Sequence, residues 1–276
     1  MIINGKLLAE DYENQIKQQI EKNQYDITLA VVLVGNDPAS EIYVKNKQKA
    51  CQRVGIKSLT VKLGQDISQS ELENQIEQLV NDNKVHGILV QLPLPKTIDE
   101  KAVLEKIPYY KDVDGLTQNN LGKLFTGNSQ IIPCTPLGVV KLLETVITDF
   151  SGLDAVVVGR SNLVGKPASL LLLQKNCSVT TVHSKSKDIK KYINQADIVV
   201  CAVGKAGLLN LNDFKKGAVV IDVGINRDEN GKICGDVEKG DREDIFITPV
   251  PKGVGPMTIA MLMQNTLQCF KLQKNN

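Results

Sequence analysis

Histidines are few in this sequence and closely spaced cysteines are absent, which excludes several kinds of site. The 276 residues include only two histidines, His86 and His183. A histidine-rich metal site is therefore excluded, and a Ser-His-Asp triad would have to use one of these two. The six cysteines are far apart, with no Cys-x-x-Cys pair and no zinc-ligand spacing. We interpret them as buried, reduced thiols of a cytoplasmic protein and expect no metal.

Long apolar runs and an excess of one charge are also absent. No apolar stretch approaches the roughly 20 residues that span a bilayer, and residues 1–6 do not have the pattern of a secretory signal. Lys plus Arg is 33 and Asp plus Glu is 31, a net charge of +2, which favours neither a nucleic-acid partner nor a membrane partner. Hydrophobic residues are 42%, which is typical of a globular chain.

Strand and helix patterns alternate along most of the chain and predict an α/β fold with parallel sheets. The apolar run at 27–34 predicts a buried parallel strand. Ser68 and Glu71 form a capping box that predicts a helix start. The first set of predicted elements comprises strands 27–34, 57–63 and 86–90 and helices 38–54 and 68–82. The second set comprises strands 154–158, 178–183, 197–203 and 218–223 and helices 164–175 and 186–195.

Two α/β lobes follow from this order. Residues 108–134 predict long loops with a short helix, and Thr135-Pro136 predicts an N-cap and first turn of a helix that ends near 148. A last helix, 256–271, is apolar on several faces. We predict an N-terminal α/β lobe, 1–135, completed by the C-terminal helix 256–276, and a second, parallel-sheet lobe, 136–255.

The second lobe carries a candidate phosphate site. Gly159, Arg160 and Ser161 follow a strand, and Gly165 opens a helix. Glycine lets the backbone approach a phosphate, and a helix N-terminus supplies free N–H groups. The pattern is not the full Gly-x-Gly-x-x-Gly fingerprint, and a tight turn that binds nothing remains the alternative.

The end of the next strand indicates which nucleotide fits. NAD-binding domains place a carboxylate there for the ribose hydroxyl, whereas this chain has His183-Ser184-Lys185-Ser186-Lys187. Hydroxyls and cations suit a 2′-phosphate, and Arg160 would add a bidentate contact. NADP is therefore favoured over NAD, with a solvated loop as the alternative.

The first lobe carries a candidate proton-transfer group. Ser40, Tyr43 and Lys47 share one helical face, and a desolvated lysine there could move protons. Gln91 ends a strand, and Asp114 lies in an Asp-Val-Asp-Gly loop, so both could meet Lys47 at the carboxyl edge of the sheet. The alternatives are a solvated basic face with Lys45 and Lys49, and a turn in which Asp114 caps its own backbone.

Together these motifs resemble the bifunctional methylenetetrahydrofolate dehydrogenase/methenyltetrahydrofolate cyclohydrolase family, over about residues 5–268. The likeness also includes a loop before the last helix, which could close over a ligand or act as a plain hinge. The motifs, in chain order, are Ser40-x-x-Tyr43-x-x-x-Lys47, Gly87–Gln91 with Leu-Pro-Leu-Pro95, Lys111–Gly115, Pro133–Pro136, Val158–Ser161 with Val164-Gly165-x-Pro167, Val220–Asn226, and Pro249–Thr258.

The resemblance implies two lobes that flank a cleft, an N-terminal α/β catalytic lobe and a Rossmann-like parallel-sheet nucleotide-binding lobe. It also implies a homodimer, formed through the nucleotide-binding lobe, that acts on tetrahydrofolate derivatives. It implies NADP-dependent oxidation of 5,10-methylenetetrahydrofolate to the methenyl form and hydrolysis to 10-formyltetrahydrofolate. Lys47 would transfer protons, Gln91 would support Lys47, Tyr43 would pack along the folate ring and Asp114 would bind it. The implied NADP contacts are Gly159, Arg160, Ser161, Ser184 and Ile225, and Thr258 would lie near both ligands.

Two departures and three rival functions accompany this interpretation. Lys252 replaces a glycine of the family's Pro-Gly-Gly-Val-Gly loop, and Ala206 replaces the proline of its Gly-Lys-Pro-Gly turn. A short-chain dehydrogenase is disfavoured, because there the Tyr-Lys pair follows the glycine turn, whereas Tyr43 precedes Gly159 by over 100 residues. A monofunctional dehydrogenase would most simply lack Lys47. A non-catalytic NADP-binding module would bind the nucleotide without turnover.

Overall fold

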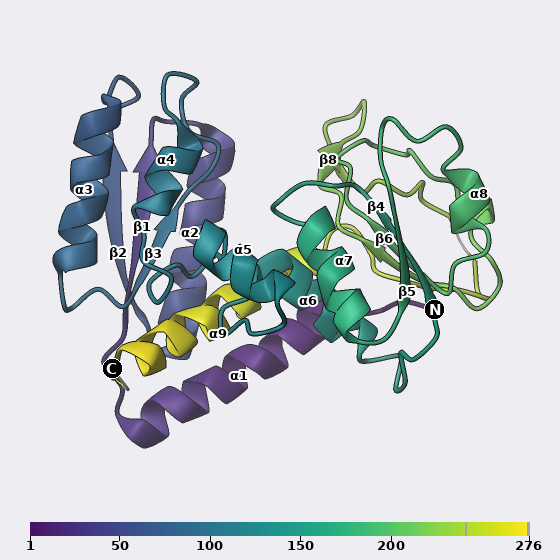
Figure 1. Ribbon diagram of the computed structural model, residues 1–276, viewed down its shortest axis with the longest axis horizontal. Coiled ribbons are helices and arrows are strands. Elements are labelled where there is room, and N and C mark those ends of the chain that lie inside the picture. The colour runs from purple at the N-terminus through teal and green to yellow at the C-terminus, as the bar shows by residue number, and fades with distance from the viewer. Residues whose placement is uncertain (241, 275–276) are drawn as a thin grey trace. The chain divides into compact units, whose positions relative to one another are not determined.

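The computed structural model describes residues 1–240 and 242–274 and divides into two compact units, drawn in Figure 1. The first unit comprises residues 11–134 and 259–274, and the second comprises residues 1–10 and 135–258. The predicted boundary placed residues 1–10 in the first lobe. They belong instead to the second unit, because the chain start pairs with an edge of that unit's sheet.

The sheet of the first unit is parallel, with strand order β2-β1-β3. The central strand β1 (Thr28–Val34) is almost completely buried, as its continuous apolar run predicted. It pairs on one side with β2 (Lys57–Leu63), and on the other with β3 (Gly87–Val90). The edge strand β2 is largely exposed.

Local sequence signals fix the helices around this sheet. Helix α2 (Pro38–Val54) begins where the Asp37 carboxylate accepts the N–H of Ser40, and it ends at Gly55, whose φ of 85° is left-handed. Helix α3 (Gln69–Asn81) begins at the predicted capping box. The remaining helices that contribute to this unit are α1 (Gly5–Asn23), α4 (Glu100–Glu105), α5 (Gln118–Phe125) and α9 (Val254–Lys274).

The two faces of the first sheet are covered by different helices. On one face Ala30, Val32 and Val34 pack with Leu72 and Ile76 of α3. Near β3, a side chain at Gly87 would meet Val113 and Thr266 of α9, so glycine permits close packing there. Helices α1 and α9 lie side by side (Figure 1), and Lys271 donates to Gln19 at 2.9 Å.

The sheet of the second unit has five parallel strands in the order β10-β7-β6-β4-β5. In order of occurrence along the chain this is the doubly wound arrangement 2-1-3-4-5 read from the other edge. A small antiparallel hairpin stands apart from the sheet. The strands are β4 (Asp154–Val158), β5 (Ser178–Val182), β6 (Ile198–Cys201), β7 (Val219–Asp222) and β10 (Phe246–Ile247), with the hairpin β8 (Asn226–Arg227) and β9 (Ile233–Cys234).

The helical segments of the second unit only partly follow the prediction. Helix α7 (Gly165–Gln174) agrees with the predicted 164–175. Helix α6 (Cys134–Leu143) begins one residue before Thr135 and ends well before 148, so Thr135 is not its N-cap. The predicted helix 186–195 is reduced to the single turn α8 (Lys190–Ile193), because residues 183–186 form a hydrogen-bonded turn instead. A 3-10 turn, η1 (Leu211–Asp213), precedes β7.

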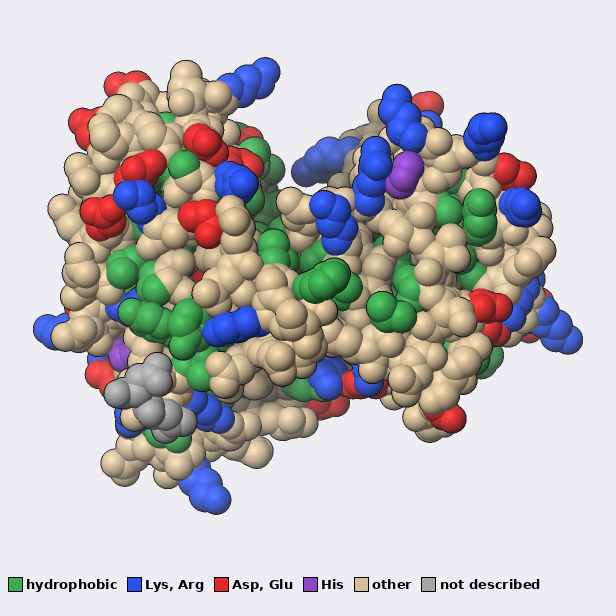
Figure 2. Space-filling model, viewed as in Figure 1, with side chains coloured by type: hydrophobic (Ala, Val, Ile, Leu, Met, Phe, Trp, Pro, Cys, Tyr) green, Lys and Arg blue, Asp and Glu red, His purple; other side chains and the backbone are tan. Residues whose placement is uncertain are grey.

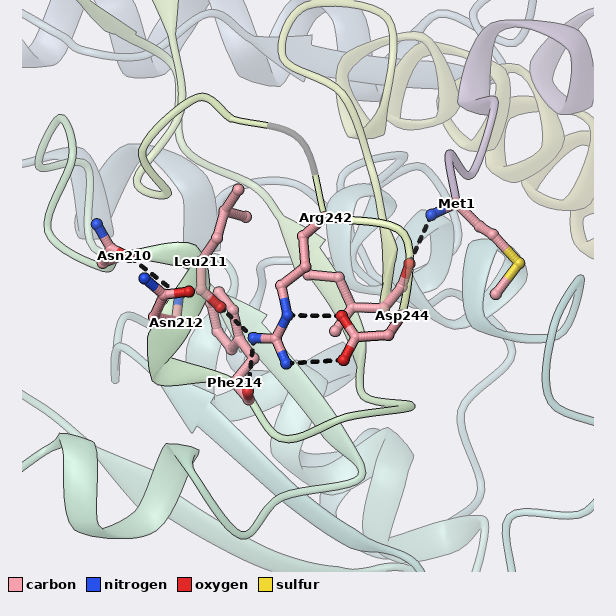
Figure 3. Close-up of polar contacts among 8 residues, drawn as sticks. Met1, Asn210, Leu211, Asn212, Phe214, Arg242 and Asp244 are labelled. Carbon is pink, nitrogen blue, oxygen red and sulfur yellow. Dashed lines mark hydrogen bonds and ion pairs between the residues drawn. The ribbon is translucent and has the colours of Figure 1, made fainter.

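The outer edge of this sheet is closed by the start of the chain. Ile3 N–H donates to Ile247 O, and Ile247 N–H donates to Met1 O, both at 2.9 Å. The Met1 ammonium donates to Ile245 O at 2.6 Å, beside the Arg242–Asp244 ion pair drawn in Figure 3. Arg242 also donates to the carbonyl oxygens of Leu211 and Phe214, so one guanidinium ties η1 to the loop before β10.

Among the described residues, no helix is both long enough and apolar enough to cross a membrane. The parallel sheets and two units confirm the predicted α/β class with a Rossmann-like second lobe.

Candidate active site

Each sheet has a point at which the chain connections turn in opposite directions, and ligands of open α/β sheets bind at the carboxyl ends of the strands there. In the first unit this point lies between β1 and β3, and in the second between β4 and β6. Gln91 immediately follows β3, and Gly159 immediately follows β4. The predicted site residues of each unit therefore lie at the edge where general topology expects a ligand.

In the first unit, a hydrogen bond joins the side chains of Lys47 and Gln91. Lys47 Nζ on α2 donates to Gln91 Oε1 at 2.9 Å. The Gln91 amide is itself oriented, because its Nε2 donates to Leu92 O at 2.7 Å. An amide that donates on one side must present its oxygen on the other. The Lys47 ammonium is thus held by an amide oxygen whose orientation is fixed.

Burial separates Lys47 from the neighbouring lysines. Lys45 and Lys49 are exposed, whereas Lys47 is half-buried, which argues against a uniformly solvated basic face. Ser40 is buried, and Tyr43 is 41% exposed. An exposed aromatic ring one turn from a held amine offers a surface on which a flat ligand can stack.

Asp114 is half-buried, and the adjacent turn does not depend on it. The carboxylate that holds the turn belongs to Asp112, which accepts the N–H groups of Gly115 and Thr117, each at 2.9 Å. Asn120 also donates to Asp112 at 2.9 Å. The alternative in which Asp114 caps its own turn therefore does not hold. Burial raises the pKa of Asp114, and the nearby Lys47 ammonium opposes that rise.

Two buried groups that the sequence analysis did not single out contact this loop. Asn265 on α9 donates from Nδ2 to Val113 O at 2.9 Å and to Ile132 O at 2.8 Å. Cys134 Sγ donates to Val113 O at 3.3 Å, beside Asp114. Asn265 lies at helical spacing from the apolar residues Met261 and Cys269, and this place on an apolar face was the available signal.

In the second unit, the backbone after β4 is closely packed against its neighbours. Gly159 has φ 128°, and a side chain there would overlap the carbonyl oxygen of Ala202. A side chain at Gly165 would overlap the carbonyl oxygen of Gly159. Ser161 Oγ accepts the N–H of Val164 at 3.1 Å at the start of α7. Both glycines are thus required for a strand–turn–helix that presents backbone to a ligand.

The other predicted nucleotide contacts lie at this end of the second unit's sheet. Arg160, Ser161 and Ser184 are exposed, and Ile225 is 53% exposed. Lys185 and Lys187 are also exposed, and Figure 2 shows Lys and Arg side chains gathered on this unit beside a histidine. Residues 183–187 include no carboxylate that would repel a 2′-phosphate.

Two buried acids organise the loops around that edge, and the sequence analysis missed them. Asp236 is fully buried and accepts the N–H groups of Val203, Gly204 and Lys205 and the side chain of Asn226. Asp222 accepts the N–H groups of Gly224, Asp236 and Val237. Burial raises the pKa of Asp222 to about 6.

Thr258, near the start of α9, lies in the second unit. Its Oγ1 is 3.0 Å from Thr135 Oγ1 and donates to Val254 O at 3.3 Å. Both threonines belong to motifs on which the resemblance was based. Within residues 1–240 and 242–274, no group of three His, Cys, Asp or Glu side chains is arranged to hold a metal ion.

Comparison with known proteins places these features in one family. Two family models match: the tetrahydrofolate dehydrogenase/cyclohydrolase catalytic domain over residues 3–114, and its NAD(P)-binding domain over residues 133–274. A curated relative, the bifunctional protein FolD of Staphylococcus saprophyticus, is 49% identical, covering 99% of this chain and 98% of its own.

Solved structures agree along the whole chain. The bifunctional FolD methylenetetrahydrofolate dehydrogenase/cyclohydrolase of Campylobacter jejuni has a TM-score of 0.95 and 46% identity, covering 99% of both chains. The Trypanosoma brucei FolD enzyme, solved with NADP and an inhibitor, has a TM-score of 0.95 and 35% identity, covering 100% of this chain and 99% of that one. The chain belongs to the tetrahydrofolate dehydrogenase/cyclohydrolase family.

Proposed function

We propose that this protein oxidises 5,10-methylenetetrahydrofolate with NADP to 5,10-methenyltetrahydrofolate, and then hydrolyses that product to 10-formyltetrahydrofolate. The observation that carries the proposal is the Lys47–Gln91 hydrogen bond beside Asp114. It supplies a held amine, an oriented amide and a carboxylate in the unit that matches the catalytic-domain model.

For the oxidation, the chain's task is to bind and orient two rings. The close backbone packing at Gly159 and Gly165 fits a bound pyrophosphate, and Arg160 with Ser184 would hold the 2′-phosphate. Ser161 and Ile225 would complete the nucleotide contacts. NADP, when bound, supplies the hydride acceptor. On the folate side, Asp114 would accept hydrogen bonds from ring N–H groups, and Tyr43 would pack along the ring.

For the hydrolysis, Lys47 would manage the protons. Water adds to the cationic methenyl carbon, one carbon–nitrogen bond breaks to leave the formyl group, and one proton is released. Lys47 Nζ would carry protons between the water, the departing ring nitrogen and solvent, while Gln91 Oε1 fixes the direction of the amine. Thr258 would lie near the reacting ends of both ligands.

A coupled assay tests the function directly. The enzyme is mixed with 5,10-methylenetetrahydrofolate and either NADP or NAD, and the methenyl absorbance is followed as it rises and decays. We expect turnover with NADP, a much slower rate with NAD, and decay faster than in buffer alone. A rise without enzymatic decay would identify a monofunctional dehydrogenase. Nucleotide binding without any rise would identify a non-catalytic module.

The proposal includes the assembly and the compartment. The six cysteines are free thiols, which suits the reducing cytoplasm. A homodimer through the second unit is supported by β5, an edge strand whose residues are mostly exposed, since such edges invite pairing with another chain. Light scattering on the purified protein checks this, because a monomer at micromolar concentration would contradict it.

A further inference from the structure

Helix α9 carries a buried amide side chain, that of Asn265. Asn265 is 3% exposed on α9, among the buried residues Met261, Leu262 and Met263. Burying an amide is unfavourable unless its hydrogen bonds are replaced. Here both amide hydrogens are used, on Val113 O and Ile132 O. These acceptors belong to two loops that are distant from α9 in the sequence, so the amide links α9 to both loops.

The two loops joined by Asn265 are also packed directly against each other. Gly115 has φ 68°, and a side chain there would lie 2.9 Å from the backbone of Ile132 and Pro133. No space remains for the loops to shift closer together. Loss of the amide would instead free them to move apart, since its two hydrogen bonds are what link both loops to α9.

The Cys134 thiol adds a second hydrogen bond to the loop that carries Asp114. Its Sγ donates to Val113 O at 3.3 Å and accepts a hydrogen bond from Asn265 Nδ2 at 3.5 Å. Burial raises the pKa of this thiol far above its ordinary value, so the sulfur keeps its proton and remains a hydrogen-bond donor. The Val113 carbonyl, the thiol and the amide thus form a connected group that joins the residue before Asp114 to α9.

We propose that Asn265 and Cys134 are positioning residues, which hold the Asp114 carboxylate in the orientation that binds the folate ring. This inference rests on the role proposed above for Asp114. Neither residue touches the reacting atoms, and each acts through the loop that carries the carboxylate. Loosening that loop would therefore weaken folate binding and leave nucleotide binding unchanged.

The test measures the dissociation constant for tetrahydrofolate by calorimetry in Asn265→Ala and in a matched control. Thr266→Val is the control, because Thr266 is also fully buried on α9 but its hydroxyl donates only to Leu262 O of the same helix. We expect Asn265→Ala to raise the constant about tenfold, equivalent to one lost hydrogen bond to an oriented site. Thr266→Val should change it by less than about twofold, and neither should change the constant for NADP.

Asp114→Ala and the double variant Asp114→Ala/Asn265→Ala distinguish a wrong role for Asn265 from a wrong role for Asp114. If Asn265 acts through Asp114, its replacement has no further effect once the carboxylate is gone. An equal increase in both backgrounds would overturn the positioning role. A wild-type constant in folded Asn265→Ala would also overturn it, provided that Asp114→Ala weakens binding. A wild-type constant in Asp114→Ala rejects the proposed role of Asp114 itself.

Cys134 provides a second route if Asn265→Ala does not fold. Cys134→Ala removes the donor, whereas Cys134→Ser keeps one in nearly the same place. We expect Cys134→Ala to weaken tetrahydrofolate binding and Cys134→Ser to restore most of it. Equal dissociation constants in the two variants would contradict the proposal, because a purely structural role would not depend on the donor.

Discussion

The backbone N–H of Asp236 donates to the carboxylate of Asp222 at 2.9 Å, so two buried acids lie next to each other in the second unit. Each carboxylate is surrounded mainly by backbone N–H groups. Such groups stabilise negative charge, but burial of Asp222 outweighs them and raises its pKa to about 6. This arrangement has consequences for stability and for nucleotide binding.

Stability should decline as pH rises through the titration of Asp222. In the folded protein the group keeps its proton up to about pH 6, whereas the unfolded chain loses it near the ordinary value of 3.8. Between these values the folded state binds more protons, so the free energy of unfolding falls with rising pH, by up to about 3 kcal/mol from this group. Chemical denaturation of the wild type and Asp222→Asn between pH 4 and 7 measures the difference. If the free energy of unfolding changes with pH in the same way in both proteins, the raised pKa of Asp222 is contradicted.

Asp236→Asn should weaken NADP binding. The carboxylate accepts four hydrogen bonds, and an amide would present N–H groups to some of the same donors. The loops after β6 and β7 would shift, so we expect the dissociation constant for NADP to rise about tenfold or more. Asp228→Asn is the control, since Asp228 also accepts backbone N–H groups but within the exposed hairpin turn. Unchanged NADP affinity in a folded Asp236→Asn protein would refute this.

Lys47→Ala should abolish the hydrolysis and spare NADP affinity. Loss of a proton-transfer group typically lowers a rate by about 100-fold or more. The methenyl intermediate should then accumulate in the coupled assay. Lys45→Ala, which removes an exposed lysine from the same helix, should behave like the wild type. If Lys47→Ala hydrolyses the intermediate at the wild-type rate, the role assigned to this residue is wrong.

Lys252→Gly should stabilise the protein. Lys252 has φ 84°, a left-handed conformation that costs a residue with a side chain about 1 kcal/mol and glycine almost nothing. Lys252→Ala is the matched control, because alanine loses the charge but keeps the strain. Thermal unfolding should give a higher midpoint for the glycine variant than for the alanine variant. An alanine variant as stable as the glycine variant, or more stable, would contradict the backbone strain at this position.

Local signals in the sequence were enough to predict most of the first unit. Asp37 and Pro38 mark the start of α2, Gly55 marks its end, and the observed helix spans the predicted residues 38–54. Helix α1 was not predicted, because its sequence is mostly polar and its buried residues, such as Ile16 and Ile20, are sparse. Strand β10 has only two residues and carries no periodic signal.

Buried polar residues were the main part of the site that sequence reasoning did not find. Asp222, Asp236 and Asn265 are surrounded by partners far away along the chain. A propensity or a spacing describes only near neighbours, so it cannot reveal which loop supplies the N–H group that makes burial of a carboxylate tolerable. The contact between Lys47 and Gln91, by contrast, could be predicted, because one lies on a helix face and the other follows the end of a strand.

The Asp236 carboxylate accepts hydrogen bonds from residues 203–205 only through their main-chain N–H groups. Every amino acid except proline provides such a group. Gly204 and Gly207 are needed for their left-handed φ, but Ala206 is not among the residues with positive φ. Residue 206 supplies none of these N–H groups, so we expect proline or alanine at this position to leave the course of the loop unchanged. Apart from its two glycines, this turn can therefore vary in sequence and keep its shape, because its hydrogen bonds to Asp236 involve no side chain of residues 203–205.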